Sequence, residues 1–240
     1  MPRLLAILIL LAALPAAANE AAIRKALEGK LDGARIEGVQ PAPVPGLWEV
    51  RYRGEEGVKV LYSDPTGKYL IQGRIYELGA NRDVTEERTR KLNAVRFESL
   101  PLDLAVKVQR GNGRRVMAMF SDPYCPACRQ FERSLAQIDD ITIYYFMYPV
   151  IRPENANHSR SVWCSPDRAK AWLELAAAAQ PKVPAASPNC ANPVDKLLPA
   201  GRTLRENATP TLFLANGERN SGGLAADDLR ALLDETVAAR

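Results

Sequence analysis

Residues 120–129 of this 240-residue chain read FSDPYCPACR, a stretch that contains the Cys-x-x-Cys pair Cys125 and Cys128. The preceding residues, 115–120, form an apolar run typical of a buried strand, and residues 129–138 carry apolar side chains at helical spacing. A strand, a Cys-x-x-Cys and a helix in this order predict a redox-active dithiol, with Cys125 at the N-terminus of the helix.

The position of the helix start predicts a different role for each cysteine. Unpaired backbone N–H groups and the positive end of the helix dipole stabilise a thiolate, so Cys125 is the predicted nucleophile. Cys128 lies one turn further in, where we expect it to be shielded but able to close a disulfide with Cys125. Pro126 suits the first helical turn, which needs no N–H at that position. This is the arrangement of a thioredoxin-type redox site.

Two other interpretations of the pair stay open. Cys125 and Cys128 could join Cys164 and Cys190 in a structural zinc site, although a second closely spaced pair is absent from the sequence. A purely structural disulfide within the Cys-x-x-Cys would close so short a loop that it constrains little of the unfolded chain. We therefore expect a redox site, and neither a metal nor another cofactor.

The amino terminus predicts export. Arg3 is followed by an apolar run at 4–14 and by the alanines at 16–18, a pattern typical of a cleaved signal peptide covering residues 1–18. The run is short for a membrane span, which needs about 18 apolar residues; an uncleaved anchor is the alternative. The mature chain is expected in an oxidising compartment, where four cysteines can form two disulfides.

Charge and composition exclude some functions. The formal net charge is +4, from 32 Lys and Arg against 28 Asp and Glu, and the two signs alternate along the chain. Without a basic stripe that carries aromatic residues, no nucleic-acid partner is expected.

Three segments are expected to follow the signal peptide, giving an α+β protein. Residues 19–82 predict a small domain with one helix and three strands, namely a helix at 20–31 and strands at 47–52, 58–63 and 69–76. Such a domain lies near the lower size limit for independent stability, so pairing with a second copy is an attractive completion. Gly73, inside the third predicted strand, is the candidate for close approach across that interface.

Residues 83–108 predict a helical linker, and residues 109–240 a catalytic domain. A charged helix at 83–100 opens with Asp83 and Glu86 at capping-box spacing, and an ordinary surface helix is the alternative to a spacer. Within the catalytic domain, the sequence pattern predicts a strand, a helix and a second strand, followed by a helical insertion, a hairpin and a final helix. Its later elements are a strand at 141–150, a helix at 166–179 capped by Ser165, a hairpin around 211–219 and a helix at 227–239.

The remaining cysteines, Cys164 and Cys190, flank the predicted helix of the insertion. A structural disulfide between them is the favoured prediction in an oxidising compartment, worth on the order of 3 kcal/mol in the loop-entropy model. A second redox centre that relays electrons, or a pair of reduced core thiols, is the alternative. His158 lies in a polar segment and is expected to face solvent, while Asp122 is expected to be a turn residue at the helix entry.

A thioredoxin-like fold places a cis proline beside its cysteines, and Thr209-Pro210 stands at the corresponding position before the last hairpin. With a cis bond, the Thr209 backbone could pair with an extended substrate segment while Pro210 packs near the sulfurs. A trans proline at an edge strand is the alternative.

The whole pattern resembles the periplasmic DsbC-type protein disulfide isomerases. The resemblance rests on several stretches spread over the mature chain: Gln40 to Gly46, Tyr69 to Tyr76, Phe120-Ser121-Asp122 before the Cys-x-x-Cys, Trp163-Cys164 with Cys190, and Thr209-Pro210. It implies an amino-terminal dimerisation domain and a thioredoxin-like catalytic domain, joined in a V-shaped homodimer that holds misfolded clients. It also implies periplasmic localisation, chaperone activity, Cys125 as attacking thiol and a membrane reductase of the DsbD type as partner.

One departure from the family concerns the dipeptide between the cysteines. It is Pro126-Ala127 here, whereas the best-known members carry Gly-Tyr, and this dipeptide tunes the redox potential. A monomeric dithiol oxidase or reductase of the same fold, and a holdase chaperone with a minor redox role, are the competing functional hypotheses.

Overall fold

A computed structural model describes residues 14–55, 57–204 and 208–238. It contains two compact units, and the division between them falls between Asn93 and Ala94, inside the predicted linker segment. Residues 1–13 of the predicted signal peptide lie outside the described residues, so its cleavage stays a prediction. Within the described ranges, no helix has both the length and the apolar character that crossing a membrane requires.

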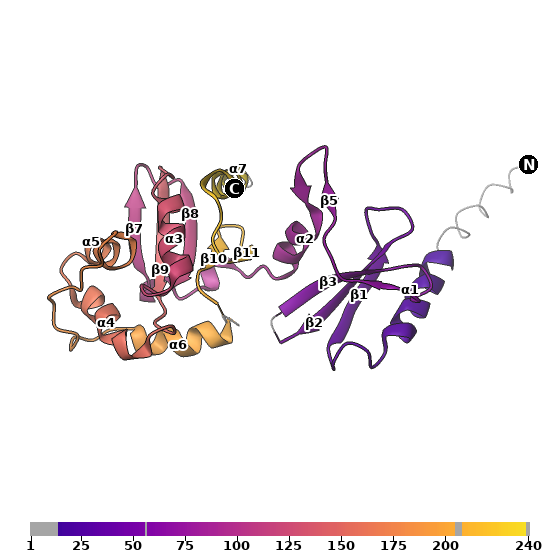
Figure 1. Ribbon diagram of the computed structural model, residues 1–240, viewed down its shortest axis with the longest axis horizontal. Helices are drawn as coiled ribbons and strands as arrows, with labels where there is room; N and C mark the ends of the chain where they lie inside the picture. Colours follow the sequence, from indigo (N-terminus) through magenta and orange to yellow (C-terminus); the bar gives the residue numbers. More distant parts are fainter. Residues whose placement is uncertain (1–13, 56, 205–207, 239–240) are drawn as a thin grey trace, which may run out of the picture. The chain divides into compact units, whose positions relative to one another are not determined.

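The first unit has a helix on a small antiparallel sheet, then a strand pair and a second helix (Figure 1). The sheet order is β1-β2-β3-β4, and β5 pairs with β6. Its elements are α1 (Leu14–Leu27), β1 (Arg35–Pro41), β2 (Trp48–Gly54), β3 (Gly57–Ser63), β4 (Leu70–Ile71), β5 (Tyr76–Glu77), β6 (Arg82–Asp83) and α2 (Val84–Leu92).

The core of this unit is small. Ile23 and Leu27, one turn apart on α1, are buried against strand residues that include Val50 and Leu61. Gly67, in the turn after β3, has φ +76°, and a Cβ there would lie 3.0 Å from the Ile23 Cα. Glycine is therefore needed both for the backbone conformation and for the approach of the turn to α1.

The prediction of one strand over 69–76 is wrong. The segment divides into the two-residue strands β4 and β5, and Gly73 lies at an exposed bend between them. The sequence pattern also misses strand β1, which pairs with β2 from Arg35 to Pro41, because turns that contain glycine or proline flank it closely.

Helix α2 begins as predicted but ends earlier. The Asp83 carboxylate accepts a hydrogen bond from Glu86 N at 2.8 Å, which caps the helix. The Asn93 amide accepts from Val58 N and donates to Val58 O, at 2.8 and 2.7 Å. These bonds to β3 end the helix at Leu92 instead of Leu100, and a 3-10 turn, η1 (Phe97–Ser99), follows.

The second unit is a five-stranded sheet of order β11-β10-β8-β9-β7, in which only β8 and β9 are parallel. Helices α4, α5 and α6 lie together next to β7 and β9 (Figure 1). Its helices and strands are β7 (Val106–Arg110), β8 (Arg115–Ser121), α3 (Pro126–Leu135), β9 (Ile141–Met147), α4 (Ala156–Cys164), α5 (Arg168–Trp172), α6 (Val194–Thr203), β10 (Thr211–Leu214), β11 (Arg219–Ser221) and α7 (Ala226–Ala238).

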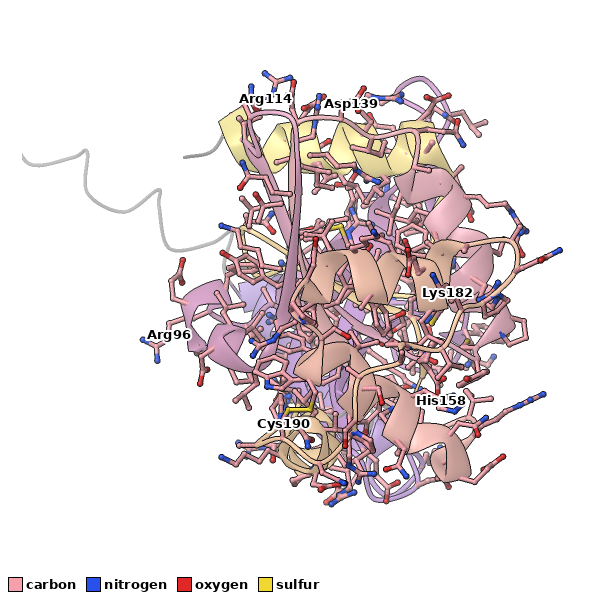
Figure 2. The ribbon with its side chains drawn as sticks, turned by 90° about the vertical axis from the view of Figure 1, so that its left-hand side faces the viewer. Arg96, Arg114, Asp139, His158, Lys182 and Cys190 are labelled. Carbon is pink, nitrogen blue, oxygen red and sulfur yellow. A yellow bond between two sulfur atoms is a disulfide. The ribbon has the colours of Figure 1, made fainter. Side chains whose placement is uncertain are left out.

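The core of the second unit is large and centred on β8. Met117, Ala118, Met119 and Phe120 are all fully buried, because β8 has strands on both sides and helices over the sheet. At Arg115, the first residue of β8, the guanidinium donates to both carboxylate oxygens of Asp234 on α7. This ion pair lies near the labelled residues Arg114 and Asp139 (Figure 2).

The helical insertion differs from its prediction. Ser165 does not cap a helix; its hydroxyl donates to Ser161 O at 2.8 Å. Helix α5 starts at Arg168, and the Asp167 carboxylate caps it by accepting from Lys170 N at 2.9 Å. The chain then forms a π-helical segment, η4 (Leu173–Ala177), before Ala178 turns extended, so the predicted helix at 166–179 is interrupted.

Candidate active site

The loop between β8 and α3 is organised by one buried carboxylate. Asp122 accepts hydrogen bonds from Tyr124 N at 2.8 Å and from Ile151 N at 2.7 Å, while its backbone oxygen accepts from Cys125 N at 3.1 Å. Its side chain is fully buried. Asp122 is therefore the expected turn residue, and it also ties the loop to the segment after β9.

Cys125 is the N-cap of α3, with Pro126 in the first turn. The thiol is a free cysteine with 6% of its surface exposed. Its Sγ lies 3.2 Å from Thr209 O and donates a hydrogen bond to it. The N–H groups of the first helical turn lack carbonyl partners within the helix and carry partial positive charge, an environment that favours a thiolate.

Cys128 is also free, and with 2% exposure it is less accessible than Cys125. Burial raises the pKa of Cys128 to about 12, while the Ser121 hydroxyl, the Asp122 N–H and the Thr209 hydroxyl act in the opposite direction. The thiol is thus strongly biased toward its protonated form. A thiol at the helix cap and a second, more shielded thiol are therefore placed one helical turn apart.

The structure brings Thr209 and Pro210 to this dithiol from a part of the chain more than 80 residues away. The Thr209–Pro210 peptide bond is cis. Pro210 is buried, and its backbone oxygen accepts from Gly222 N at 2.8 Å, at the end of the hairpin. The carbonyl of Thr209 is the group that Cys125 contacts.

Sequence reasoning missed an aromatic contact beside Cys125. The Tyr124 hydroxyl hydrogen-bonds His158 Nδ1 on α4, and the Arg152 guanidinium lies 5.7 Å from the centre of the Tyr124 ring. The sequence predicts that His158 faces solvent, but the residue is half-buried. No spacing rule connects residues 34 apart on a loop and a helix, so only the fold reveals this contact.

A second buried carboxyl lies on α3, one turn after Cys128. Glu132 accepts a hydrogen bond from the Tyr145 hydroxyl at 3.1 Å, and its other oxygen has no hydrogen-bond partner among the described residues. Burial raises the pKa of Glu132 to about 7, against the opposing effects of Tyr145, Arg110 and Arg129. No pattern in the sequence marks Glu132, since a Glu on a helix is usually exposed.

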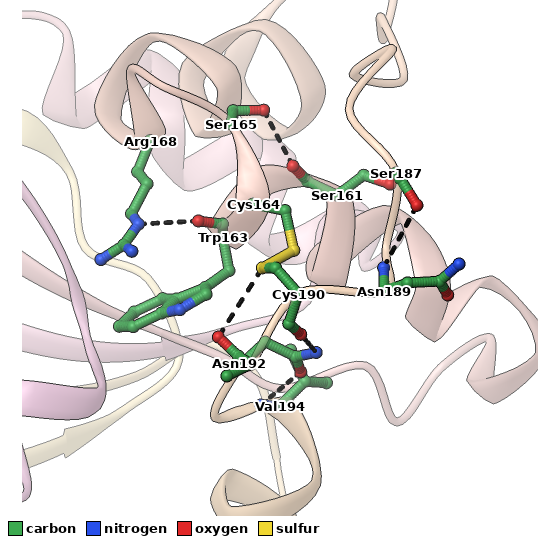
Figure 3. The surroundings of a disulfide bond; sticks show 11 residues. Ser161, Trp163, Cys164, Ser165, Arg168, Ser187, Asn189, Cys190, Asn192 and Val194 are labelled. Carbon is green, nitrogen blue, oxygen red and sulfur yellow. Dashed lines mark hydrogen bonds between the residues drawn. A yellow bond between two sulfur atoms is a disulfide. The ribbon is translucent and has the colours of Figure 1, made fainter.

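Cys164 and Cys190 form a disulfide with Cα atoms 5.8 Å apart (Figure 3). It joins the C-terminal end of α4 to the segment before α6. Trp163 packs beside it under the Arg168 guanidinium, 3.9 Å from the ring centre. Since these two sulfurs bond to each other, they are not zinc ligands together with Cys125 and Cys128. Over the described ranges, no cluster of His, Cys, Asp and Glu is arranged to hold a metal ion.

Gly73, the predicted interface residue, belongs to the first unit and not to this site. Around it, the first unit exposes large apolar side chains, which we call the apolar strip. Leu78 is 90% exposed, and the other members are Tyr69, Leu70, Ile71 and Tyr76.

A thioredoxin-like sheet with a free Cys-x-x-Cys at the start of α3 and a cis proline against it defines a protein of thiol–disulfide exchange. In agreement, residues 102–236 match the family model of a thioredoxin-like domain, and residues 14–86 match that of the disulfide bond isomerase protein N-terminal domain.

The chain belongs to the DsbC family. It is 40% identical over 212 residues to a probable thiol:disulfide interchange protein DsbC of Bordetella pertussis, covering 88% of this chain and 73% of that protein. It is 26% identical to the thiol:disulfide interchange protein DsbC of Escherichia coli, over 92% and 89% of the two chains. A crystal structure of a disulfide interchange protein from Neisseria gonorrhoeae, 37% identical, covers 57% of this chain and 97% of that one at a TM-score of 0.53.

These matches confirm the predicted family, the α+β fold with its two kinds of domain, and an enzyme of thiol–disulfide exchange. The roles of individual residues stay predictions, and the geometry above supplies the grounds for them.

Proposed function

We propose that the protein is a homodimeric protein disulfide isomerase and reductase that acts on misfolded exported proteins. The observation that carries the proposal is the unequal dithiol: Cys125 caps α3 in contact with Thr209 O, while Cys128 lies deeper and remains protonated. Such a pair attacks with one sulfur and holds the other in reserve.

In the proposed reaction, the Cys125 thiolate attacks one sulfur of a wrong disulfide in the client. A mixed disulfide forms, and the second client sulfur leaves as a thiolate. A different client thiol then displaces Cys125, which rearranges the disulfide without net oxidation. Alternatively Cys128 displaces the client, which leaves the client reduced and Cys125 and Cys128 joined.

The Thr209 backbone is proposed to bind the client next to the scissile disulfide. In the protonated state, the Cys125 thiol donates its hydrogen bond to Thr209 O. Once Cys125 has lost this proton, the Thr209 carbonyl has lost its donor. The oxygen is then available to an N–H of an extended client segment, with Pro210 closing the site behind it.

The apolar strip is proposed to hold a second copy of the chain. Strand β4 is only two residues long and forms one edge of the first sheet, where Leu70 and Ile71 are exposed. Unpaired edge strands with apolar side chains are sites of strand pairing. A Cβ at Gly73, in the bend that follows, would meet nothing within 4 Å beyond its chain neighbours, so the bend leaves room for a partner backbone.

Four further parts of the proposal rest on family membership, on the predicted signal peptide and on the segment that joins the two units. The protein would work in the periplasm, be kept reduced by a membrane reductase of the DsbD type, and bind unfolded clients as a chaperone. A helical spacer within residues 83–108 would set the distance between the two kinds of domain.

The test is reactivation of a protein with scrambled disulfides in glutathione buffer, combined with sedimentation analysis. We expect the double variant Leu70→Glu/Ile71→Glu to become monomeric and to lose isomerisation while it still reduces a small disulfide. Val183→Glu, which introduces a glutamate at an exposed apolar residue of the second unit, is the control and should change neither property. A Leu70→Glu/Ile71→Glu protein that remains dimeric, or that isomerises normally as a monomer, contradicts the proposal.

A further inference from the structure

The hydroxyl of Ser121, the last residue of β8, is buried without a hydrogen-bond partner of normal geometry among the described residues. The residue is fully buried, and its backbone oxygen accepts from Tyr148 N at 2.9 Å. The backbone oxygen is therefore satisfied, whereas the side-chain hydroxyl is not. A buried hydroxyl without a partner destabilises the folded state, so the group beside the Ser121 hydroxyl decides what this side chain can do.

The Ser121 hydroxyl acts on the sulfur of Cys128. The Ser121 hydroxyl lies close enough to lower the pKa of that thiol, as do the Asp122 N–H and the Thr209 hydroxyl. The Thr209 hydroxyl is a second buried oxygen without a normal partner among the residues that the structure describes. Donors from the end of β8, the following loop and the segment before β10 thus converge on one sulfur. Cys125 differs, because its Sγ points its own proton at the Thr209 carbonyl.

This arrangement is poor for a thiol and good for a thiolate. A neutral thiol is a weak acceptor, which leaves the Ser121 hydroxyl largely unsatisfied, whereas a thiolate accepts strong charge-assisted hydrogen bonds. Such donors are most useful where charge develops during a reaction and water is excluded. Cys128 is only 2% exposed, so little water reaches its sulfur, and the converging donors take the place of that water.

We propose that the Ser121 hydroxyl is a catalytic hydrogen-bond donor that stabilises the Cys128 thiolate when Cys128 displaces a client from Cys125. The inference deepens the proposed function and rests on its mixed-disulfide intermediate.

The step balances within the protein and its client. Cys128 gives its proton to solvent, and its thiolate attacks the Cys125 sulfur. The bond between Cys125 and the client sulfur breaks, and the client sulfur leaves as a thiolate that solvent protonates. The client has gained two electrons, and the two cysteines have become a disulfide. In the reverse direction, when a reductant thiol attacks Cys125, Ser121 stabilises Cys128 as the leaving thiolate.

Ser121 would therefore influence whether Cys128 or another client thiol resolves the mixed disulfide. A well-stabilised Cys128 thiolate favours release of a reduced client. A slower Cys128 leaves the intermediate to other client thiols and favours rearrangement.

The test uses the full chain in its reduced form with a limiting amount of an aromatic disulfide that releases a coloured thiol at each step. The first release reports attack by Cys125, and the second reports displacement by Cys128. For Ser121→Ala we expect an unchanged first phase and a second phase slowed about tenfold, the effect of losing a hydrogen bond to a charged group. The lower rate should persist across pH values below the pKa of Cys128, because the thiolate remains the reacting species.

Ser159→Ala is the matched control. Ser159 is also fully buried, and its hydroxyl also lacks a partner among the described residues, but it lies on α4. We expect normal rates for both phases in this variant. Equal second phases in Ser121→Ala and Ser159→Ala would overturn the inference. Absence of the first phase in the unmodified protein would instead overturn the proposed function.

A second pair of variants keeps the inference testable if alanine disturbs folding. Ser121→Thr and Ser121→Val add nearly the same volume, but only threonine retains a hydroxyl. A fast second phase in the threonine variant and a slow one in the valine variant support the role of Ser121. Equal second phases in these two variants refute it.

Discussion

The two cysteine pairs of this protein occupy opposite kinds of helix end. Cys125 begins α3, whereas Cys164 ends α4. Backbone N–H groups at a helix start stabilise a thiolate, and backbone carbonyls at a helix end do not. Burial differs in the same direction, since the free pair is buried while Cys190 is exposed. Since all four residues are cysteines, position relative to a helix and burial are what distinguish the free pair from the bonded pair.

The largest expected effect comes from removing Cys125, the proposed nucleophile. Cys125→Ser should reduce reactivation of a scrambled client to the background rate of the glutathione buffer, because Cys128 is buried and its pKa is about 12. Reactivation assays and alkylation of the remaining thiol measure this directly.

Cys190→Ser provides the contrast, since it removes a sulfur from the other pair. Its activity per folded molecule should stay near that of the unmodified protein. If Cys125→Ser retains substantial activity, or if Cys190→Ser abolishes it without unfolding, the assignment of roles to the two pairs is wrong.

The second pair should affect stability most. Its disulfide links residues separated by 26 positions, and the loop-entropy model assigns such a link about 3 to 4 kcal/mol. We expect Cys164→Ala/Cys190→Ala to lose this much free energy of unfolding in urea titrations. A loss below about 1 kcal/mol would show that the bridge constrains the unfolded chain far less than the loop-entropy model states.

The sequence predicts the parts of this fold whose signals are local. β8, α3 and the hairpin of β10 and β11 follow from apolar runs, a proline in the first helical turn and an Asn-Gly turn. The exchange chemistry also follows from local sequence, because the strand, the Cys-x-x-Cys and the helix are contiguous.

Other features depend on contacts between distant residues, which no local pattern encodes. Asn93 ends α2 by bonding the backbone of Val58, and Asp167 takes the cap expected at Ser165 because that hydroxyl bonds Ser161 O. Two contacts likewise exist only after the sheet has formed. They join Ser121 to Cys128 and Tyr124 to His158.

Glu132, on the same helix as Cys125 and Cys128, makes stability depend on pH. Burial raises the pKa of Glu132 to about 7 from 4.5, so the folded protein keeps this proton where the unfolded chain has released it. The contribution of Glu132 to stability is complete below pH 4.5 and is lost as the pH rises through about 7. At 1.36 kcal/mol per pKa unit, the loss amounts to about 3 kcal/mol.

Glu132→Gln should remove this loss, because glutamine imitates the protonated acid. Urea titrations at pH values on both sides of the transition measure the difference between the variant and the unmodified protein. Glu154→Gln makes the same change at an exposed residue and should preserve the original pH dependence. A Glu132→Gln protein that retains the full loss would assign it to other groups.

The smallest expected effect concerns the hydrogen bond between the Tyr124 hydroxyl and His158 on α4. Tyr124→Phe removes the hydrogen bond to His158, which should cost about 1 kcal/mol of stability. If this hydrogen bond also holds the loop before Cys125 in its reactive conformation, losing about 1 kcal/mol slows attack by Cys125 roughly fivefold. Tyr144→Phe is the control, since that ring contacts Phe97 and Lys107.

Helix α4 carries His158, which holds the loop before Cys125, and also Cys164, the first cysteine of the bridge. If the bridge fixes α4 in place for this contact, Tyr124→Phe should have a smaller effect once Cys164 and Cys190 are alanines. A double-mutant cycle on attack by Cys125 measures this coupling. A clear interaction energy would mean that the structural pair supports the reactive pair through α4. Additive effects would mean that the two pairs are energetically independent, although one helix serves both.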